Sequence, residues 1–279
     1  MATKRKSRPA KLTAKTADPH RLYELSVQSV DSEIDFIEQT FRQLRKRPAR
    51  RLREDFCGTA NTSVEWVKRS PRNIAVGVDL HAPTLQWGLD KRISRLSPSQ
   101  QRRITLLNRN VLDPGPRARR MDAILAMNFS YWIFKSRKLM KQYFAAVHAS
   151  LVKDGVFFLD FVGGWECLKN HREVRPLKTR LGKFKYIWSQ SHYNPISGDI
   201  LCHISFLFPD GSRLGRAFTY DWRLWSIPEL RDILEEVGFK KVTVYWEGDD
   251  GKGGGNGDFK PNTTGEVCAS FISYIVAEK

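Results

Sequence analysis

The sequence lacks any long apolar run, and it has few acidic residues for its number of basic ones. No stretch reaches the roughly 18 to 20 apolar residues that a membrane-spanning helix needs, and no secretory signal pattern is visible. We therefore expect a cytoplasmic protein without membrane contact. The 30 acidic residues stand against 47 basic ones, which gives a formal net charge of +17 at pH 7. That charge favours anionic partners such as nucleic acid, although a solvated basic surface gives the same total.

Cysteine is also scarce. The four cysteines, Cys57, Cys167, Cys202 and Cys268, are far apart and form no C-x-x-C pair. This spacing indicates reduced thiols in a cytosolic protein, and together with the scattered histidines it predicts no metal site. With 279 residues of which 41% are hydrophobic, the chain can build the core of one large domain with an insertion.

A dinucleotide-type glycine loop is missing where the chain otherwise has the layout of a nucleotide crevice. Residues 52–60 read Leu-Arg-Glu-Asp-Phe-Cys-Gly-Thr-Ala, and residues 75–80 read Ala-Val-Gly-Val-Asp-Leu. The pattern predicts a strand, a tight turn and a helix, then a second buried strand that ends at Asp79. An acid there can accept hydrogen bonds from ribose hydroxyls. With Gly58 alone in place of three glycines, the turn fits a pyrophosphate poorly.

The turn resembles motif I of class I S-adenosylmethionine (SAM) methyltransferases, which reads acid-x-G-x-G-x-G. Aligned on residues 57–59, Glu54 takes the acid position and Gly58 the central glycine. Phe56 and Ala60 depart from the motif, which leaves the path of the loop open.

The resemblance extends over about residues 50 to 279. In the family a residue that follows the third strand contacts adenine. Asn110 falls at that position, and Asp113 is the alternative residue for this contact. Residues 128–132 resemble motif IV but lack the prolines of amino-methylating nucleic-acid enzymes, and residues 223–230 resemble the end of the β insertion in small-molecule, glycine N-methyltransferase-like enzymes. The resemblance therefore implies that the chain binds SAM through Glu54, Phe56, Cys57, Gly58, Thr59, Asp79, Leu80, Asn110, Val111, Asn128 and Phe129.

The order of the elements predicts the fold. Five near-continuous apolar strands, each following a helical pattern, indicate a parallel sheet that is covered on both faces. The last helix and two strands match the antiparallel final strand of class I methyltransferases. We expect an α/β protein with a Rossmann-like, seven-stranded, mostly parallel sheet over residues 52–279, in which residues 248–265 form a glycine-rich loop.

The N-terminal region divides into two parts. Residues 1–17 contain no acid, and we expect a disordered basic arm that is a candidate contact for RNA or an acidic partner. Asp18 and Pro19 predict the start of a helix, and a second helix with regularly spaced apolar residues follows. The resemblance implies that residues 18–51 form a lid over SAM.

Residues 184–224 alternate aromatic and polar side chains between turn signals, which predicts a three-stranded antiparallel β insertion. A period of two places Trp188 and His192 on one face of the first strand, and Arg216 with Trp222 on one face of the third. Such a mixture suits a small organic substrate, although packing on the main domain explains each residue equally well.

Methyl transfer from SAM mainly requires alignment and exclusion of water. A base is needed only if the nucleophile stays protonated near neutral pH. His192 is the candidate base, because histidine titrates in that range, and Tyr131 is the alternative as an orienting hydroxyl. Three functions remain open: N- or O-methylation of a small organic acceptor, methylation of rRNA or tRNA, and non-catalytic SAM binding. The sequence indicates neither the acceptor nor an oligomeric state.

Overall fold

The structure is a computed structural model that describes residues 12–279. Its helices are α1 Pro19–Val27, α2 Val30–Arg45, α3 Asn61–Arg69, α4 Ala82–Lys91, α5 Pro98–Gln101, α6 Arg137–Ser150 and α7 Ile227–Val237, with 3₁₀ turns η1 Ile93–Arg95, η2 Pro116–Ala118, η3 Ser130–Ile133 and η4 Trp165–Leu168. Its strands are β1 Arg51–Asp55, β2 Ile74–Asp79, β3 Ile104–Asn108, β4 Met121–Ala126, β5 Leu151–Gly163, β6 His171–Thr179, β7 Gly182–Ser191, β8 Asp199–Leu207, β9 Arg213–Arg223, β10 Lys241–Asp249, β11 Gly255–Asn262 and β12 Phe271–Glu278. No helix among these residues is long and apolar enough to cross a membrane.

The main sheet has the strand order β11-β10-β12-β5-β4-β1-β2-β3. Strands β1 to β5 are parallel, and β12 is antiparallel to β5 and to β10. This confirms the predicted Rossmann-like sheet with an antiparallel last strand. The edge strand β11 is additional and lies in the segment that was predicted to be a loop. Its side chains are almost all exposed, so hydrophobic periodicity gives no signal for it.

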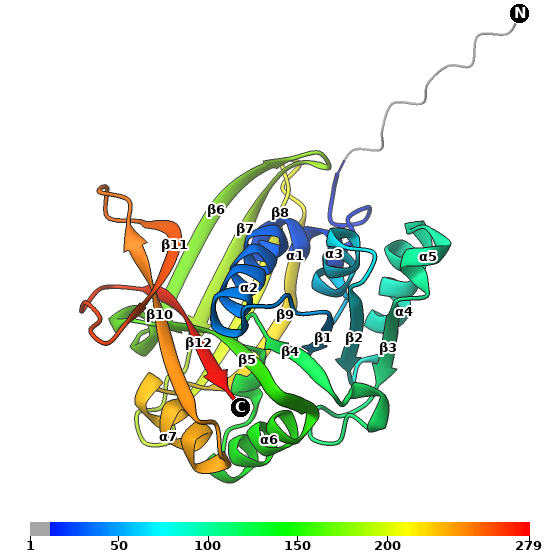
Figure 1. Cartoon of the computed structure of the whole chain (residues 1–279). Coiled ribbons are helices and arrows are strands. Elements are labelled where there is room, and N and C mark those ends of the chain that lie inside the picture. The colour runs from blue at the N-terminus through cyan, green and yellow to red at the C-terminus, as the bar shows by residue number, and fades with distance from the viewer. Residues whose placement is uncertain (1–11) are drawn as a thin grey trace, which may run out of the picture.

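Both faces of the main sheet are covered by helices, as predicted (Figure 1). On one face Ile34 of α2 and Trp66 of α3 are fully buried in the same core cluster. On the other face Phe144 of α6 and Leu230 of α7 are fully buried in a second cluster. The carboxyl ends of β1 to β5 therefore meet at one edge of a rigid sheet.

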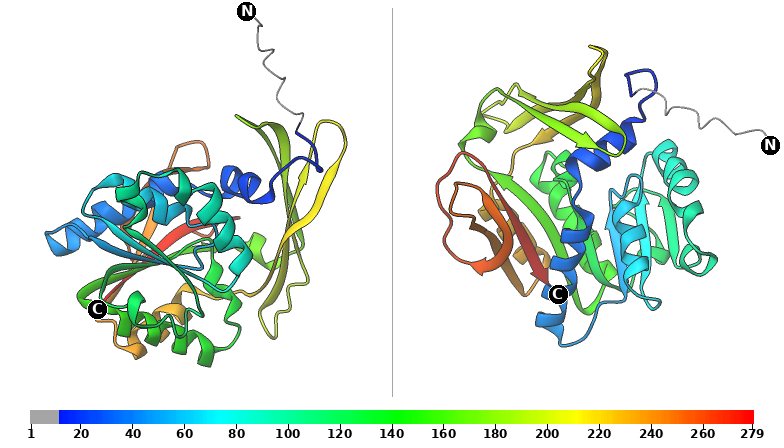
Figure 2. Two further views of the ribbon diagram at one scale, coloured as in Figure 1. Left: turned by 90° about the vertical axis from the view of Figure 1, so that its right-hand side faces the viewer. Right: turned by 90° about the horizontal axis from the view of Figure 1, so that it is seen from above.

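A second sheet, with the order β6-β7-β8-β9, is inserted between η4 and α7. It has four antiparallel strands where three were predicted. The sequence gives no signal for β6, because that strand is largely exposed and carries charged residues. Figure 2 shows α1 between this sheet and the main domain, where the fully buried Leu22 packs with Phe184 and Phe206.

The last residues of the predicted basic arm contact the second sheet. Leu12 and Ala14 pack against the second sheet, and the backbone N–H of Ala14 donates to Ser212 Oγ at 2.9 Å. Part of the predicted basic arm therefore contacts the second sheet, and residues 1–11 lie outside the described residues. Asp18 caps α1 as predicted, by accepting the backbone N–H of His20 at 2.9 Å.

Candidate active site

The turn between β1 and α3 has left-handed backbone at three alternate positions. The φ angles are 55° at Phe56, 50° at Gly58 and 58° at Ala60. These are the positions at which motif I has glycine, and a residue with a side chain pays about 1–2 kcal/mol in this conformation. The Phe56 ring packs near Tyr143, with ring centroids 5.7 Å apart, which helps to hold the strained turn. The chain thus keeps the path of a glycine-rich loop with only one of its glycines.

Asp79 at the end of β2 is bonded to this turn. Its Oδ2 accepts the backbone N–H of Gly58, and its Oδ1 accepts that of His81, each at 2.8 Å. A side chain built at Gly58 would meet only Thr84, at 3.8 Å, so the turn faces open space. A carboxylate oxygen has two lone pairs, so Asp79 retains capacity for ligand hydroxyls.

The end of β3 lies beside that of β2, and we use the word crevice for the edge formed by the ends of β1, β2 and β3. Asn108 donates its side-chain N–H to the carbonyls of Asp79 at 3.1 Å and Leu80 at 2.9 Å, which holds the ends of β2 and β3 together. The Leu80 side chain is 65% exposed beside Asp79. Asn110 is exposed and its Oδ1 accepts the backbone N–H of Leu112 at 2.9 Å, while Val111 is buried.

Helix α1 is attached to the same turn through Glu24. The Glu24 carboxylate accepts the Thr59 hydroxyl at 2.8 Å and the Arg92 Nε–H at 2.6 Å. Helix α4 also approaches the turn closely, because a side chain at Gly88 would lie 2.7 Å from the Thr59 carbonyl. These contacts fix α1 and α4 next to the turn.

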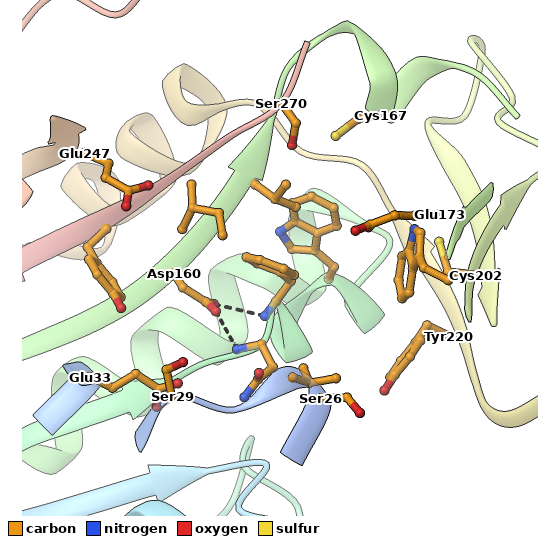
Figure 3. A pocket seen from close by; sticks show the side chains of 18 of the residues that line it. Ser26, Ser29, Glu33, Asp160, Cys167, Glu173, Cys202, Tyr220, Glu247 and Ser270 are labelled. Carbon is orange, nitrogen blue, oxygen red and sulfur yellow. Dashed lines mark hydrogen bonds between the residues drawn. The ribbon is translucent and has the colours of Figure 1, made fainter. Parts of the chain in front are cut away.

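At the end of β4, Asn128 and Phe129 have left-handed backbone, with φ angles of 57° and 55°. Their backbone N–H groups donate to the carboxylate of Asp160 on β5, at 2.6 Å and 2.9 Å (Figure 3). Burial raises the pKa of Asp160 to about 7, against the lowering effect of these two bonds. Because β4 pairs with β1, this turn lies next to the crevice.

A cavity of about 1060 Å³ opens beyond this turn. It lies between α1, α2, the ends of β4 and β5, the β10–β12 region and the second sheet (Figure 3). One wall is aromatic, and several of its rings are in contact: Trp132 and Trp222 have centroids 5.8 Å apart, and Tyr220 and Trp222 4.5 Å. Apolar walls with a few polar groups are typical of pockets for small organic molecules.

Glu33 of α2 also lines the cavity. Burial, and next the charge of Asp160, raise the pKa of Glu33 to about 7. Neither Glu33 nor Asp160 is predicted from the sequence as a site residue. The available signal is a single acid among apolar neighbours, as in Phe158-Leu159-Asp160-Phe161.

Two residues predicted for the site form hydrogen bonds with other parts of the fold. Glu54 points toward α3, where its Oε2 accepts the backbone N–H of Ser63 at 2.8 Å and the hydroxyl at 2.6 Å. Burial raises the pKa of Glu54 to about 7. The Tyr131 side chain is fully buried, and its hydroxyl donates to the carbonyl of Asp160 at 2.8 Å. Neither side chain lines the cavity.

The structure does not bring His192 or Arg216 to the cavity either. His192 is exposed just after the end of β7, where a φ of 57° breaks the two-residue period. Arg216 is exposed at a bulge between β8 and β9, with its backbone N–H donated to Ser205 Oγ at 3.0 Å. Gln190 does line the cavity, but its amide donates to the carbonyls of Glu166 and Lys169.

No family model and no curated protein matches this sequence. Solved structures do match over almost the whole chain. A S-adenosylmethionine-dependent methyltransferase from Clostridium acetobutylicum is 17% identical with a TM-score of 0.67, and the match covers 93% of this chain and 96% of that one. The SAM-bound amino pentose methyltransferase CalS10 from Micromonospora echinaspora has the same TM-score at 15% identity, with 93% and 95% covered.

The sugar N-methyltransferase KedS8 from a Streptoalloteichus species matches with a TM-score of 0.63 at 14% identity, over 100% of this chain and 98% of that one. At these identities the likeness establishes the fold. The chain therefore has the fold of class I SAM-dependent methyltransferases.

Proposed function

We propose that this chain is an enzyme that transfers the methyl group of SAM to a nitrogen or oxygen atom of a small organic acceptor. The observation that supports the proposal best is that the crevice and the cavity adjoin each other. The crevice at the ends of β1 to β3 adjoins the turn at Asn128 and Phe129, and this same turn lines the cavity. A cofactor in the crevice and an acceptor in the cavity would meet there.

The residues present fit SAM. The turn of Phe56, Cys57, Gly58 and Thr59 follows a glycine-loop path and faces open space. In the proposal Asp79 accepts the ribose hydroxyls, and the exposed Leu80 side chain packs on the adenine ring. The positions Asn110, Val111, Asn128 and Phe129 complete the site, and Glu54 lies beneath the turn, where it also holds the start of α3. The lid role of residues 18–51 is supported by the bond between Glu24 and Thr59.

SAM supplies a methyl group on a positively charged sulfonium, which needs no further activation. The protein's part is to orient the acceptor and exclude water. The aromatic wall of Trp132, Trp188, Tyr220 and Trp222 provides the apolar surface. Asp160 fixes the backbone of residues 128 and 129 where the two sites meet.

The charges of the cavity favour a small acceptor over RNA. Although the chain has a net charge of +17, acidic side chains outnumber basic ones along the cavity, as the lining residues Glu33, Asp160, Glu173, Glu247 and Asp258 illustrate. A polyanionic backbone would be repelled from such a surface.

Incubation with SAM carrying an isotopically labelled methyl group and a small-molecule cell extract tests the proposal. We expect mass spectrometry to detect a labelled small molecule together with S-adenosylhomocysteine (SAH), and neither with Asp79→Ala at limiting SAM. Label only in RNA, or no SAH above the level of heat-treated protein, would contradict it.

A further inference from the structure

Three carboxylates converge on one side of the cavity. Glu33 comes from α2, Asp160 from β5 and Glu247 from β10, and they lie opposite Glu173, Cys202 and Tyr220 (Figure 3). All three lie close enough to Tyr274 of β12 to affect the pKa of its hydroxyl, and Tyr274 pairs with Asp160 of β5 in the main sheet. Burial first, and then the charges of Glu33, Asp160 and Glu247, raise the pKa of Tyr274.

None of these three acids forms an ion pair with a described residue. Other acids along the cavity do: Glu166 pairs with Lys169, Glu173 with Arg175, and Asp258 with Lys260. Glu33 is only 8% exposed, and its Oε2 has no hydrogen-bond partner in the described part of the chain. Asp160 and Glu247 accept backbone N–H groups, Glu247 that of Gly257 at 2.9 Å, so each of the three lacks a counter-charge among the described residues. A carboxylate without a counter-charge in a largely buried site is costly, so in a chain rich in Lys and Arg this arrangement indicates a cationic ligand.

The opposite wall suits a cation as well. Trp188, Tyr220 and Trp222 form a continuous group of rings, with centroids of Trp188 and Trp222 6.3 Å apart. The faces of such rings attract ammonium groups. Carboxylates on one side and aromatic rings on the other together form a surface for an organic ammonium ion.

We infer that the methyl acceptor is an organic amine with two basic nitrogens, one beside Glu33 and Asp160 and the other beside Glu247. This rests on the proposed function. Because burial raises the pKa of both Glu33 and Asp160 to about 7, the two carboxyl groups together carry about one negative charge near neutral pH, and Glu247 supplies a second. A doubly charged acceptor balances both. The nitrogen beside Asp160 is the one that receives the methyl group, because Asp160 holds the turn next to the crevice.

Methyl transfer to that nitrogen begins with the loss of a proton. The ammonium group gives its proton to the Glu33–Asp160 pair, which frees the nitrogen lone pair. The lone pair forms the new N–C bond to the methyl carbon, and the C–S electron pair stays on sulfur. The products are neutral SAH and an N-methylammonium ion, which carries the positive charge that the sulfonium has lost.

The test is a titration of full-length, SAH-saturated protein, followed by tryptophan fluorescence from the aromatic wall. The probes are linear α,ω-diamines of three to six carbons, the matching monoamines and the matching diols. We expect at least one diamine to bind about tenfold more tightly than its monoamine, and the diols to bind more weakly than either. Equal affinities of diamines and monoamines, or diols that bind as well as amines, would overturn the inference.

Two variants sharpen the test. Glu247→Gln should abolish the preference for the diamine, whereas Glu235→Gln, at an exposed position on α7, should leave it unchanged. SAH affinity, measured for each variant, shows that the protein is folded. Intact SAH binding without a diamine preference in the parent protein overturns this inference alone, while absence of any SAM or SAH binding overturns the proposed function.

Discussion

The carboxylate of Asp160 accepts the backbone N–H of Asn128 at 2.6 Å and thereby links β5 to the left-handed turn after β4. A second bond, from the Phe129 N–H at 2.9 Å, uses its other oxygen. One side chain therefore satisfies two successive backbone donors at the junction of crevice and cavity. We therefore propose that Asp160 positions this turn, in addition to its proposed part in accepting the proton of the acceptor.

Replacement of Asp160 should affect turnover more than cofactor binding. In Asp160→Ala the turn loses both acceptors, and a displacement of the reacting groups by about 1 Å costs roughly 100-fold in rate. We expect a loss of that order in kcat with SAM affinity near the parent value, and a smaller loss in Asp160→Asn. Asp232→Ala, at an exposed position on α7, is the control. An unchanged kcat in Asp160→Ala would contradict the role.

The pH dependence of acceptor binding follows from the raised pKa values. Burial raises the pKa of both Glu33 and Asp160 to about 7, so below that pH both groups are mostly neutral. Their attraction for a cationic acceptor is then lost, and it returns as they ionise above it. We expect the acceptor KM to fall between about pH 6 and about pH 8, and this slope to flatten in Glu33→Gln. A pH-independent KM in the parent protein would argue against it.

Stability should depend on pH through Glu54. Burial raises its pKa from 4.5 to about 7 in the folded chain. Between these values the folded state holds a proton that the unfolded chain has released, so the free energy of unfolding falls as pH rises from about 4.5 to about 7. Glu54→Gln removes this loss. The difference in free energy of unfolding between the variant and the parent should therefore be about 3 kcal/mol more favourable to the variant at pH 8 than at pH 4. Urea denaturation at both pH values checks this, with Glu235→Gln as the matched control.

The ion pair of Arg53 and Asp55 is a second stability test. Its atoms are 2.8 Å apart with both side chains fully buried, and Tyr143 donates its hydroxyl to Asp55 at 2.9 Å. Asp55→Ala leaves the Arg53 charge buried without its partner and should cost about 3–5 kcal/mol. Asp35→Ala, which breaks an exposed pair with Arg69, should cost less than about 1 kcal/mol. Similar denaturation midpoints for the two variants would contradict the difference.

The sequence predicts the sheet well, because its strands are long apolar runs and the antiparallel last strand follows from two strands at the chain end. It also identifies the turn at Gly58, where the backbone keeps three left-handed positions although two lack glycine. Strands β6 and β11 have mostly exposed side chains and therefore carry no hydrophobic signal.

The cavity residues are harder to predict, because they depend on where each strand ends or bends. A bulge at Arg216 and the end of β7 before His192 turn both side chains away from the face that a strict two-residue period gives them. Glu33 and Asp160 come from elements far apart in sequence, so only the fold places their carboxylates at one cavity.

The central claim, that the crevice at Gly58 and Asp79 binds SAM, is tested most directly by calorimetric titration of SAM into the parent protein and two variants. We expect one SAM per chain, and a loss of about 1.5–3 kcal/mol of binding free energy in Asp79→Ala, because a charged acceptor of hydroxyl groups is removed. Asp232→Ala, at an exposed position on α7, should bind as the parent does. Absence of SAM binding by the parent, or equal affinities of Asp79→Ala and the parent, would contradict the account.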